Sequence, residues 1–207
     1  ELTELVKTLS RVGQYWISDP QRALEAQTRL WMSYMDLYGA MLARMAGEPV
    51  RPVAEPDPRD KRFRDEEWSE NQFFDFLKQA YLITGRWAEF LVDKADDLDE
   101  HTRHKARFYV KQLVDALSPS NFILTNPELL RETAKSNAAN LARGMQMLAE
   151  DLERGDGELR LRQTDNEKFE VGRNIAVSPG KVVAQNAVRQ LIQYAPTTET
   201  VRKTPLL

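Results

Sequence analysis

Two histidines are the side chains of this sequence best suited to chemistry. His101 and His104 lie three positions apart and directly follow the carboxylates of Asp97, Asp99 and Glu100. Imidazoles and carboxylates are ligands that bind divalent transition metals. The same residues also fit an ordinary acidic helix start with solvent-exposed histidines. We expect the second arrangement, and the sequence assigns no metal ligand.

Nucleophilic catalysis has no candidate residue in this sequence. The chain has no cysteine, and none of its 9 glycines belongs to a G-x-[SC]-x-G turn of the kind that exposes a catalytic nucleophile. Without cysteine, disulfides, thiolate zinc sites and iron–sulfur clusters are also excluded. We therefore assign no catalytic and no cofactor-binding residue, and we predict that this chain alone is inactive.

Composition and charge indicate an ordinary soluble chain. The 207 residues are 42% hydrophobic and 29% charged, with 29 Lys and Arg against 32 Asp and Glu, for a net charge of -3. This balance gives no electrostatic reason to expect nucleic acid as a partner. No apolar run approaches the roughly 18 residues that a spanning helix needs. The N-terminus also lacks the apolar core of a signal peptide. We predict no nucleic-acid partner, no transmembrane segment and a cytoplasmic location.

The first 46 residues are predicted to form an amphipathic helical pair. Ser18 and Asp19 precede Pro20, an arrangement typical of a short polar N-cap and a first-turn proline, so a second helix should begin here and end near Gly47. The first helix carries one apolar stripe with alternating spacings of three and four, made of Leu2, Leu5, Leu9, Val12 and Trp16.

The second helix carries a broad aromatic and methionine face, which is our candidate contact surface. Methionine and aromatic side chains suit adaptable apolar contacts with a partner helix, a second copy or another apolar surface. Alternatively, this face packs against Leu5, Leu9 and Trp16 in a helical hairpin. Both alternatives stay open from the sequence. The candidate contact residues are Trp31, Met35, Tyr38, Met41, Leu42 and Met45.

The middle of the chain reads as a proline-rich linker followed by helices. Residues 47–61 hold four prolines and are predicted to hinge or strap the helical pair onto the rest. Residues 62–175 are predicted to be a helical accessory domain, in which Asp99 or its neighbour caps one helix and Asn126 caps another. The pattern after Asn126 predicts one long helix ending near Gly155.

The last fifty residues change character. Leu159 and Leu161 alternate with Arg160 and Arg162, a pattern that predicts a short strand. Residues 181–195 fit a helix and a strand almost equally well. The chain ends in an apolar run at Pro205–Leu207 that looks like the cut beginning of a buried strand.

Several long stretches resemble one known family. DKRF at residues 60–63, FFDFLKQAYL at 73–82 and RFYVKQLVDALSPSNFILTNPELLRET at 107–133 are similar to the N-terminal part of class I polyhydroxyalkanoate synthases. LARGMQMLAEDLERGDGELRLRQTD at 141–165, FEVGRN at 169–174 and the segment from Pro179 follow in the same order. The resemblance covers about residues 57–207.

The resemblance implies what this piece belongs to. The family polymerises (R)-3-hydroxyacyl-CoA into polyester with release of CoA, using an α/β-hydrolase core whose catalytic cysteine, aspartate and histidine lie beyond residue 207. We therefore expect a mainly α fold, a helical N-terminal accessory domain followed at residues 176–207 by the first strand or strands of an α/β-hydrolase core that is cut off. The ambiguous stretch then becomes a strand from Lys181 to Tyr194.

The resemblance also implies partners. It suggests a homodimer, association with polyester granules in the cytoplasm and binding of phasin-type granule proteins, with the acyl-CoA substrate bound by the missing catalytic domain. The alternative is a stand-alone helical adaptor without enzymatic activity. The apolar end at Leu207 favours an interrupted chain over an adaptor with a polar tail.

Two further side-chain groups invite a functional interpretation. A basic strip on one predicted helix could hold the phosphates of coenzyme A, although a solvated helix face explains it better; it comprises Arg103, Lys105, Arg107 and Lys111. A set of aromatics could form an acyl pocket, although their helical spacing is more typical of a core. These are Phe73, Phe74, Phe76, Tyr81 and Trp87.

Overall fold

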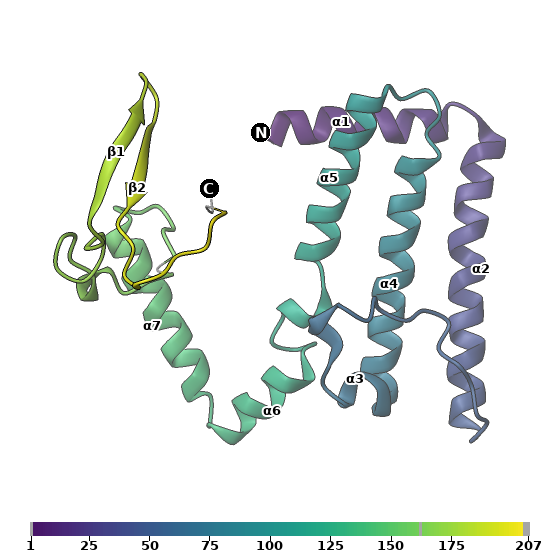
Figure 1. Cartoon of the computed structure of the whole chain (residues 1–207). Coiled ribbons are helices and arrows are strands. Elements are labelled where there is room, and N and C mark those ends of the chain that lie inside the picture. The colour runs from purple at the N-terminus through teal and green to yellow at the C-terminus, as the bar shows by residue number, and fades with distance from the viewer. Residues whose placement is uncertain (1, 162, 205–207) are drawn as a thin grey trace. The chain divides into compact units, whose positions relative to one another are not determined.

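A computed structural model describes residues 2–161 and 163–204 of the chain (Figure 1). Within this part the fold is mainly helical, as expected, with seven α-helices, three short 3₁₀-helices and one two-stranded antiparallel sheet. The chain divides into two compact units, Glu1–Arg143 and Gly144–Leu207.

Three long helices form the body of the first unit. They are α2 (Pro20–Met45), α4 (Gln72–Asp93) and α5 (Glu100–Ala116), with α4 packed between the other two. Helix α1 (Leu2–Ile17) crosses one end of the three and contacts all of them (Figure 1). Shorter elements complete the unit: η1 (Lys61–Phe63), α3 (Glu67–Glu70), η2 (Pro119–Asn121) and α6 (Pro127–Lys135).

The predicted helix starts are confirmed by their capping hydrogen bonds. The carboxylate of Asp19 accepts from the backbone N–H of Gln21 at 2.8 Å, and Pro20 follows as the first helical residue. Asp99 accepts from the N–H of Thr102 at 2.9 Å, and Asn126 does the same for α6. Each cap satisfies a donor that the first helical turn leaves unpaired.

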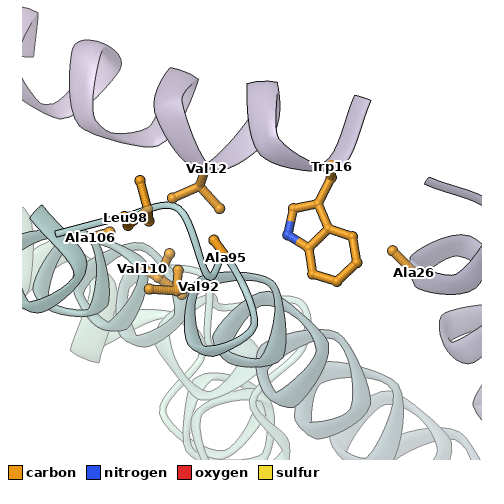
Figure 2. Packing of buried hydrophobic residues seen from close by; sticks show 8 residues of the cluster. All are labelled: Val12, Trp16, Ala26, Val92, Ala95, Leu98, Ala106 and Val110. Carbon is orange, nitrogen blue, oxygen red and sulfur yellow. The ribbon is translucent and has the colours of Figure 1, made fainter. Parts of the chain in front are cut away.

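The core of the first unit joins α1 and α2 to α4 and α5. Trp16 is buried at its centre, and its Nε1 donates to the carbonyl of Leu91 at 2.9 Å. Trp87 on α4 makes the reciprocal contact, in which its Nε1 donates to the carbonyl of Ala26 on α2 at 2.8 Å. Each indole thus buries its apolar body while its N–H stays paired. Figure 2 shows the buried cluster of Val12, Trp16, Ala26, Val92, Ala95, Leu98, Ala106 and Val110.

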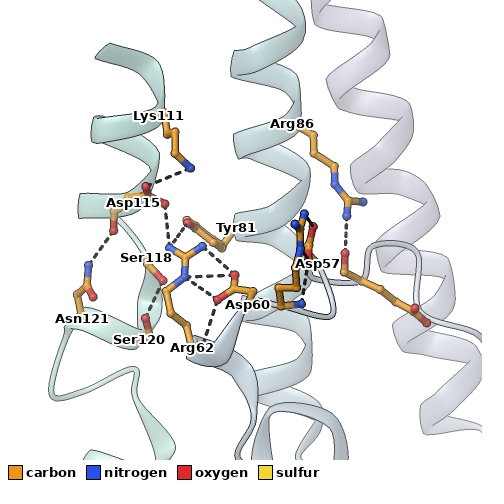
Figure 3. Close-up of polar contacts among 12 residues, drawn as sticks. Asp57, Asp60, Arg62, Tyr81, Arg86, Lys111, Asp115, Ser118, Ser120 and Asn121 are labelled. Atoms are coloured by element: carbon orange, nitrogen blue, oxygen red, sulfur yellow. Dashed lines mark hydrogen bonds and ion pairs between the residues drawn. The ribbon is translucent and has the colours of Figure 1, made fainter. Parts of the chain in front are cut away.

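The proline-rich segment, residues 47–61, is held against α4 by hydrogen bonds, and we call it the strap. The side-chain oxygen of Gln79 accepts from the backbone N–H of Val53 at 2.7 Å and from that of Ala54 at 3.1 Å. The guanidinium of Arg86 binds the carbonyl of Glu55 (Figure 3). Because this segment has no helix or strand partners for these backbone groups, α4 side chains supply an acceptor for its N–H groups and a donor for its carbonyl.

A buried polar network lies under this strap. Asp75, Lys78 and Gln79 are all buried on α4. The Asp75 carboxylate lies 2.6 Å from Nη1 of Arg44, 3.0 Å from Nζ of Lys78 and 2.7 Å from Nε2 of Gln79. Lys78 also donates to the carbonyl of Trp68 at 2.6 Å. The Asp75 carboxylate therefore binds α2 directly through Arg44. It is connected to α3 through Lys78 and to the strap through Gln79.

A second set of polar contacts ties α4 to α5. The guanidinium of Arg62 lies 2.9 Å from the Asp60 carboxylate, 3.0 Å from the Tyr81 hydroxyl and 3.1 Å from the Asp115 carboxylate (Figure 3). The hydrogen bond from Arg62 holds the pKa of Asp60 below its ordinary value.

The predicted long helix after Asn126 is wrong, because it breaks into two. Helix α6 ends at Lys135, and α7 (Ala139–Arg154) begins after a turn in which Asn137 and Ala138 have φ of 50° and 64°. The N–H of Ala138 donates to the carbonyl of Thr133 at 2.9 Å. The poor helix formers Ser136 and Asn137 were the signal for this break.

The C-terminal strand prediction also needs correction. In place of one strand from Lys181 to Tyr194, the structure has a hairpin of β1 (Gly180–Gln185) and β2 (Gln190–Tyr194). Asn186 makes the turn, since its side-chain oxygen accepts from the N–H groups of Val188 and Arg189 at 3.0 Å each. All residues of both strands are exposed.

Two other strand predictions have different outcomes. Residues 159–161, where we expected a short alternating strand, form no strand. Arg162 and the run Pro205–Leu207, where we expected the start of a buried strand, lie outside the described residues.

Removing the Asp75 carboxylate should destabilise the first unit strongly. Asp75→Ala leaves Lys78 buried without its counter-ion, a change that typically costs about 3–5 kcal/mol of unfolding free energy. Asp36→Ala is the matched control, because Asp36 is exposed on α2, and it should change stability by about 0.5 kcal/mol or less. Urea unfolding measures both. Equal costs for the two variants would contradict the role given to Asp75.

Candidate interaction surface

The inner face of α2 fixes how this helix is rotated on the unit. The Tyr34 hydroxyl lies 2.7 Å from Oγ1 of Thr84, and the Arg29 guanidinium lies 4.3 Å from the centre of the Phe90 ring. Leu37, only 1% exposed, packs in a buried cluster with Ala54 and Ile83 on the strap and α4. Together with the Arg44–Asp75 ion pair, these contacts along the helix leave the opposite side facing solvent.

That opposite side is apolar. Leu24 and Trp31 are 67% and 65% exposed, and the remaining residues are exposed as well. We call the set the outer face of α2: Leu24, Trp31, Met35, Tyr38, Leu42 and Met45. The alternative, in which these side chains pack against the first helix, does not match this exposure. Trp16 packs in the cluster that contains Ala26, which lies on the inner side of α2.

Five of the six candidate contact residues from the sequence lie on this outer face. The sixth, Met41, is half-buried on the inner side, where it lines a small cavity with Leu37, Arg44 and Asp75. Leu24, which the candidate set does not include, lies on this face as well, seven positions before Trp31.

The outer face has the spacing of a coiled-coil seam. Leu24, Trp31, Tyr38 and Met45 recur every seven residues, and Met35 and Leu42 follow the intervening four-and-three pattern. Such a seam presents its side chains to a second helix. Between Arg29 and Arg44 the only charged residue is Asp36, so covering this face would desolvate few charges.

A second apolar feature lies between α1, α2 and α4. It is a groove of about 490 Å³. Gly13 of α1 lines it, and a Cβ at that position would meet no atom within 4 Å. The other lining residues include Leu9, Trp16, Ala26, Leu30, Trp87 and Leu91.

The two histidines lie exposed at the start of α5. Asp99, the carboxylate that could have joined them, is engaged as the N-cap and also accepts from the Thr102 hydroxyl at 2.7 Å. These bonds to Thr102 hold the pKa of Asp99 below its ordinary value. Among residues 2–161 and 163–204, no group of three His, Asp or Glu side chains has the arrangement of a metal site.

The basic strip on α5 is engaged by neighbouring acceptors. Lys105 lies 2.6 Å from Glu4, and Arg107 lies 2.6 Å from Asp93. The hydrogen bond with Glu4 raises the pKa of Lys105. Arg103 donates to backbone carbonyls, while Lys111 lies 3.7 Å from Asp115. The strip therefore meets acidic side chains and carbonyls of its own unit, as a solvated helix face would.

The aromatic set of α4 is mostly structural. Phe74, Phe76, Tyr81 and Trp87 are half-buried, and Trp87 is held by its bond to Ala26. Phe73 differs from the core interpretation, since it is 60% exposed at the first turn of α4.

No described helix is long and apolar enough to cross a membrane.

Comparison with known families identifies a match over most of the chain. Residues 59–207 match the family described as the N-terminus of poly-beta-hydroxybutyrate polymerase (PhaC). The match thus takes in α3 to β2 and begins after α1 and α2. No solved structure matches the chain.

Individual relatives match over a larger part of the chain. The poly(3-hydroxyalkanoate) polymerase subunit PhaC of Rhizobium meliloti is 59% identical over 100% of this chain and 34% of its own length. The poly(3-hydroxyalkanoate) polymerase of Methylorubrum extorquens is 55% identical over the same shares. The PhaC subunit of Cupriavidus necator is 38% identical over 91% of this chain and 30% of its own length. The chain spans about a third of the length of these relatives.

Matched leucine substitutions test whether the inner face of α2 is buried and the outer face is exposed. Leu37→Ala removes a fully buried side chain and should lower the unfolding free energy by about 2–5 kcal/mol. Leu24→Ala makes the same change on the outer face and should cost about 0.5 kcal/mol or less. Thermal or urea unfolding of the two variants provides the comparison. A large cost for Leu24→Ala would mean that this face packs within the protein.

Proposed function

The chain belongs to the family of poly-beta-hydroxybutyrate polymerase N-termini, and we propose that it is the accessory N-terminal part of a poly(3-hydroxyalkanoate) polymerase. Such an acyltransferase joins (R)-3-hydroxyacyl units from coenzyme A thioesters into polyester. The reacting groups lie in the part of the polypeptide that follows residue 207. This piece supplies contacts and no catalytic residue.

The principal contact is a second copy of the polymerase, bound through the outer face of α2. The observation that supports this role is the exposed coiled-coil spacing from Leu24 to Met45 on a helix whose rotation is fixed by its inner face. Two such helices from two copies would bury each other's aromatic and methionine side chains. Granule association in the cytoplasm and binding of phasin-type granule proteins then use other surfaces of the polymerase dimer, because the outer face of α2 is buried between the two copies.

The hairpin at the end of the chain opens the α/β-hydrolase core. Both strands are exposed on both sides, and a lone two-stranded hairpin is only marginally stable in water. Val182, Ile192 and Tyr194 therefore need cover from further polypeptide. In the proposed polymerase, the strands and helices of the catalytic part provide it.

Reading the gene past the codon for Leu207 tests the enzymatic part of the proposal. We expect the reading frame to continue for roughly twice the length of this chain and to encode G-x-C-x-G followed by an aspartate and a histidine. If a stop codon follows directly, the polymerase proposal fails. The stand-alone helical adaptor then takes its place.

Substitutions on the outer face test the contact role in the full-length polymerase. Trp31→Gln combined with Tyr38→Gln should raise the dimer dissociation constant by about tenfold or more, because exposed aromatics at the centre of an interface carry much of its energy. The lag before polymerisation should lengthen, and less enzyme should sediment with granules. Analytical ultracentrifugation, a CoA-release assay and granule fractionation provide the readouts.

The matched control places two glutamines on α1, where Leu2 and Val6 are exposed to a similar degree. Leu2→Gln with Val6→Gln should leave dimerisation, lag and granule recovery unchanged. The contact role is contradicted if the α2 variant behaves like this control. A loss of granule recovery with unchanged dimerisation would assign the outer face to the granule and not to a second copy.

A further inference from the structure

In the loop between α5 and α6, polar side chains form hydrogen bonds with the backbone and with each other. Ser118 is fully buried, and its hydroxyl lies 2.8 Å from that of Ser120. The amide of Asn121 donates to the carbonyl of Asp115 at 2.8 Å (Figure 3). Thr125 and Asn126 close the loop by donating to the carbonyls of Pro119 and Ser120 at 2.7 and 2.8 Å. This loop is therefore an ordered structure and not a loose connection.

The apolar side chains of the same loop face solvent. Leu124 is 78% exposed, and Phe122 and Ile123 are exposed beside it. We call these three residues the apolar tip. Leu117, the residue directly before the loop, is exposed as well. Single exposed apolar residues are common on proteins, but three in succession on a hydrogen-bonded loop form a preorganised contact surface.

We infer that the apolar tip docks onto the part of the polymerase that follows residue 207. This inference rests on the proposed function, because it needs that further polypeptide. Two observations select this occupant. First, the relatives are about three times as long as this chain, so about two thirds of such a protein lies outside the structure. Second, the tip lies within residues 59–207, which match the N-terminus of a polymerase that continues beyond this segment.

These observations separate the two apolar surfaces of the first unit. The outer face of α2 is a helical seam with the spacing of a coiled coil, which suits contacts between molecules. The apolar tip is a short loop within the segment that matches the polymerase N-terminus family, which suits a contact with the rest of the same polypeptide. The tip therefore joins the accessory part to the catalytic part within one polypeptide.

Hydroxyl-radical footprinting of the full-length polymerase tests this docking. Leu124 and Leu2 are the same residue type and are 78% and 76% exposed in the structure, so they should oxidise equally fast if neither is covered. Docking predicts that Leu124 oxidises several-fold more slowly than Leu2. Equal rates for the two leucines would overturn the inference.

Matched variants of the full-length polymerase give a second, independent measurement. Leu124→Gln should lower the melting temperature by about 2 °C or more, because it removes one buried apolar contact. Leu2→Gln should leave it unchanged. Protein concentration separates the possible occupants. If the protection of Leu124 disappears when the dimer is diluted to monomer, the tip contacts a second copy and the inference is overturned.

Failure of the inference and failure of the proposed function can be told apart. Equal oxidation of the two leucines in a polymerase that does extend past residue 207 would overturn the docking and leave the proposed function standing. A reading frame that ends at residue 207 would overturn both.

Discussion

The first unit depends on one buried carboxylate. Asp75 lies where α2, α3, α4 and the strap meet, and it binds Arg44, Lys78 and Gln79 at once. The side-chain oxygen of Gln79 in turn accepts hydrogen bonds from two backbone N–H groups of the strap. Because a buried charge is tolerated only when its partners are in place, these elements must all assemble for any of them to be stable.

This constraint has a functional side. The Arg44–Asp75 pair anchors the C-terminal end of α2, while Tyr34, Leu37 and the indole of Trp87 hold its length against α4. A helix held at so many points keeps one face outward. The exposed seam is therefore a fixed feature of the unit, and a partner would meet a surface that is already ordered.

The sequence predicted those features that depend on local chemistry. Asp19, Asp99 and Asn126 cap helices because a short polar side chain next to the first turn suffices, whatever the tertiary context. It could not predict which side of α2 is buried, since inner Leu37 and outer Leu42 are the same residue type. The Asp75 network was also missed, because Arg44, Asp75 and Gln79 read individually as surface residues. The hairpin turn was missed because Asn186 lies in a stretch whose periodicity fits both strand and helix.

The core of the first unit is complete early in synthesis, because all of its residues lie in the first part of the chain. This core uses side chains between Val12 and Val110, and the contact of Glu4 with Lys105 joins α1 to α5. A ribosome making a longer polymerase therefore finishes this core before the polypeptide beyond residue 207 is translated. The seam on α2 then exists on the nascent chain earlier than the catalytic groups. If two copies pair through this seam, as proposed, their pairing does not have to wait for the enzyme to be complete.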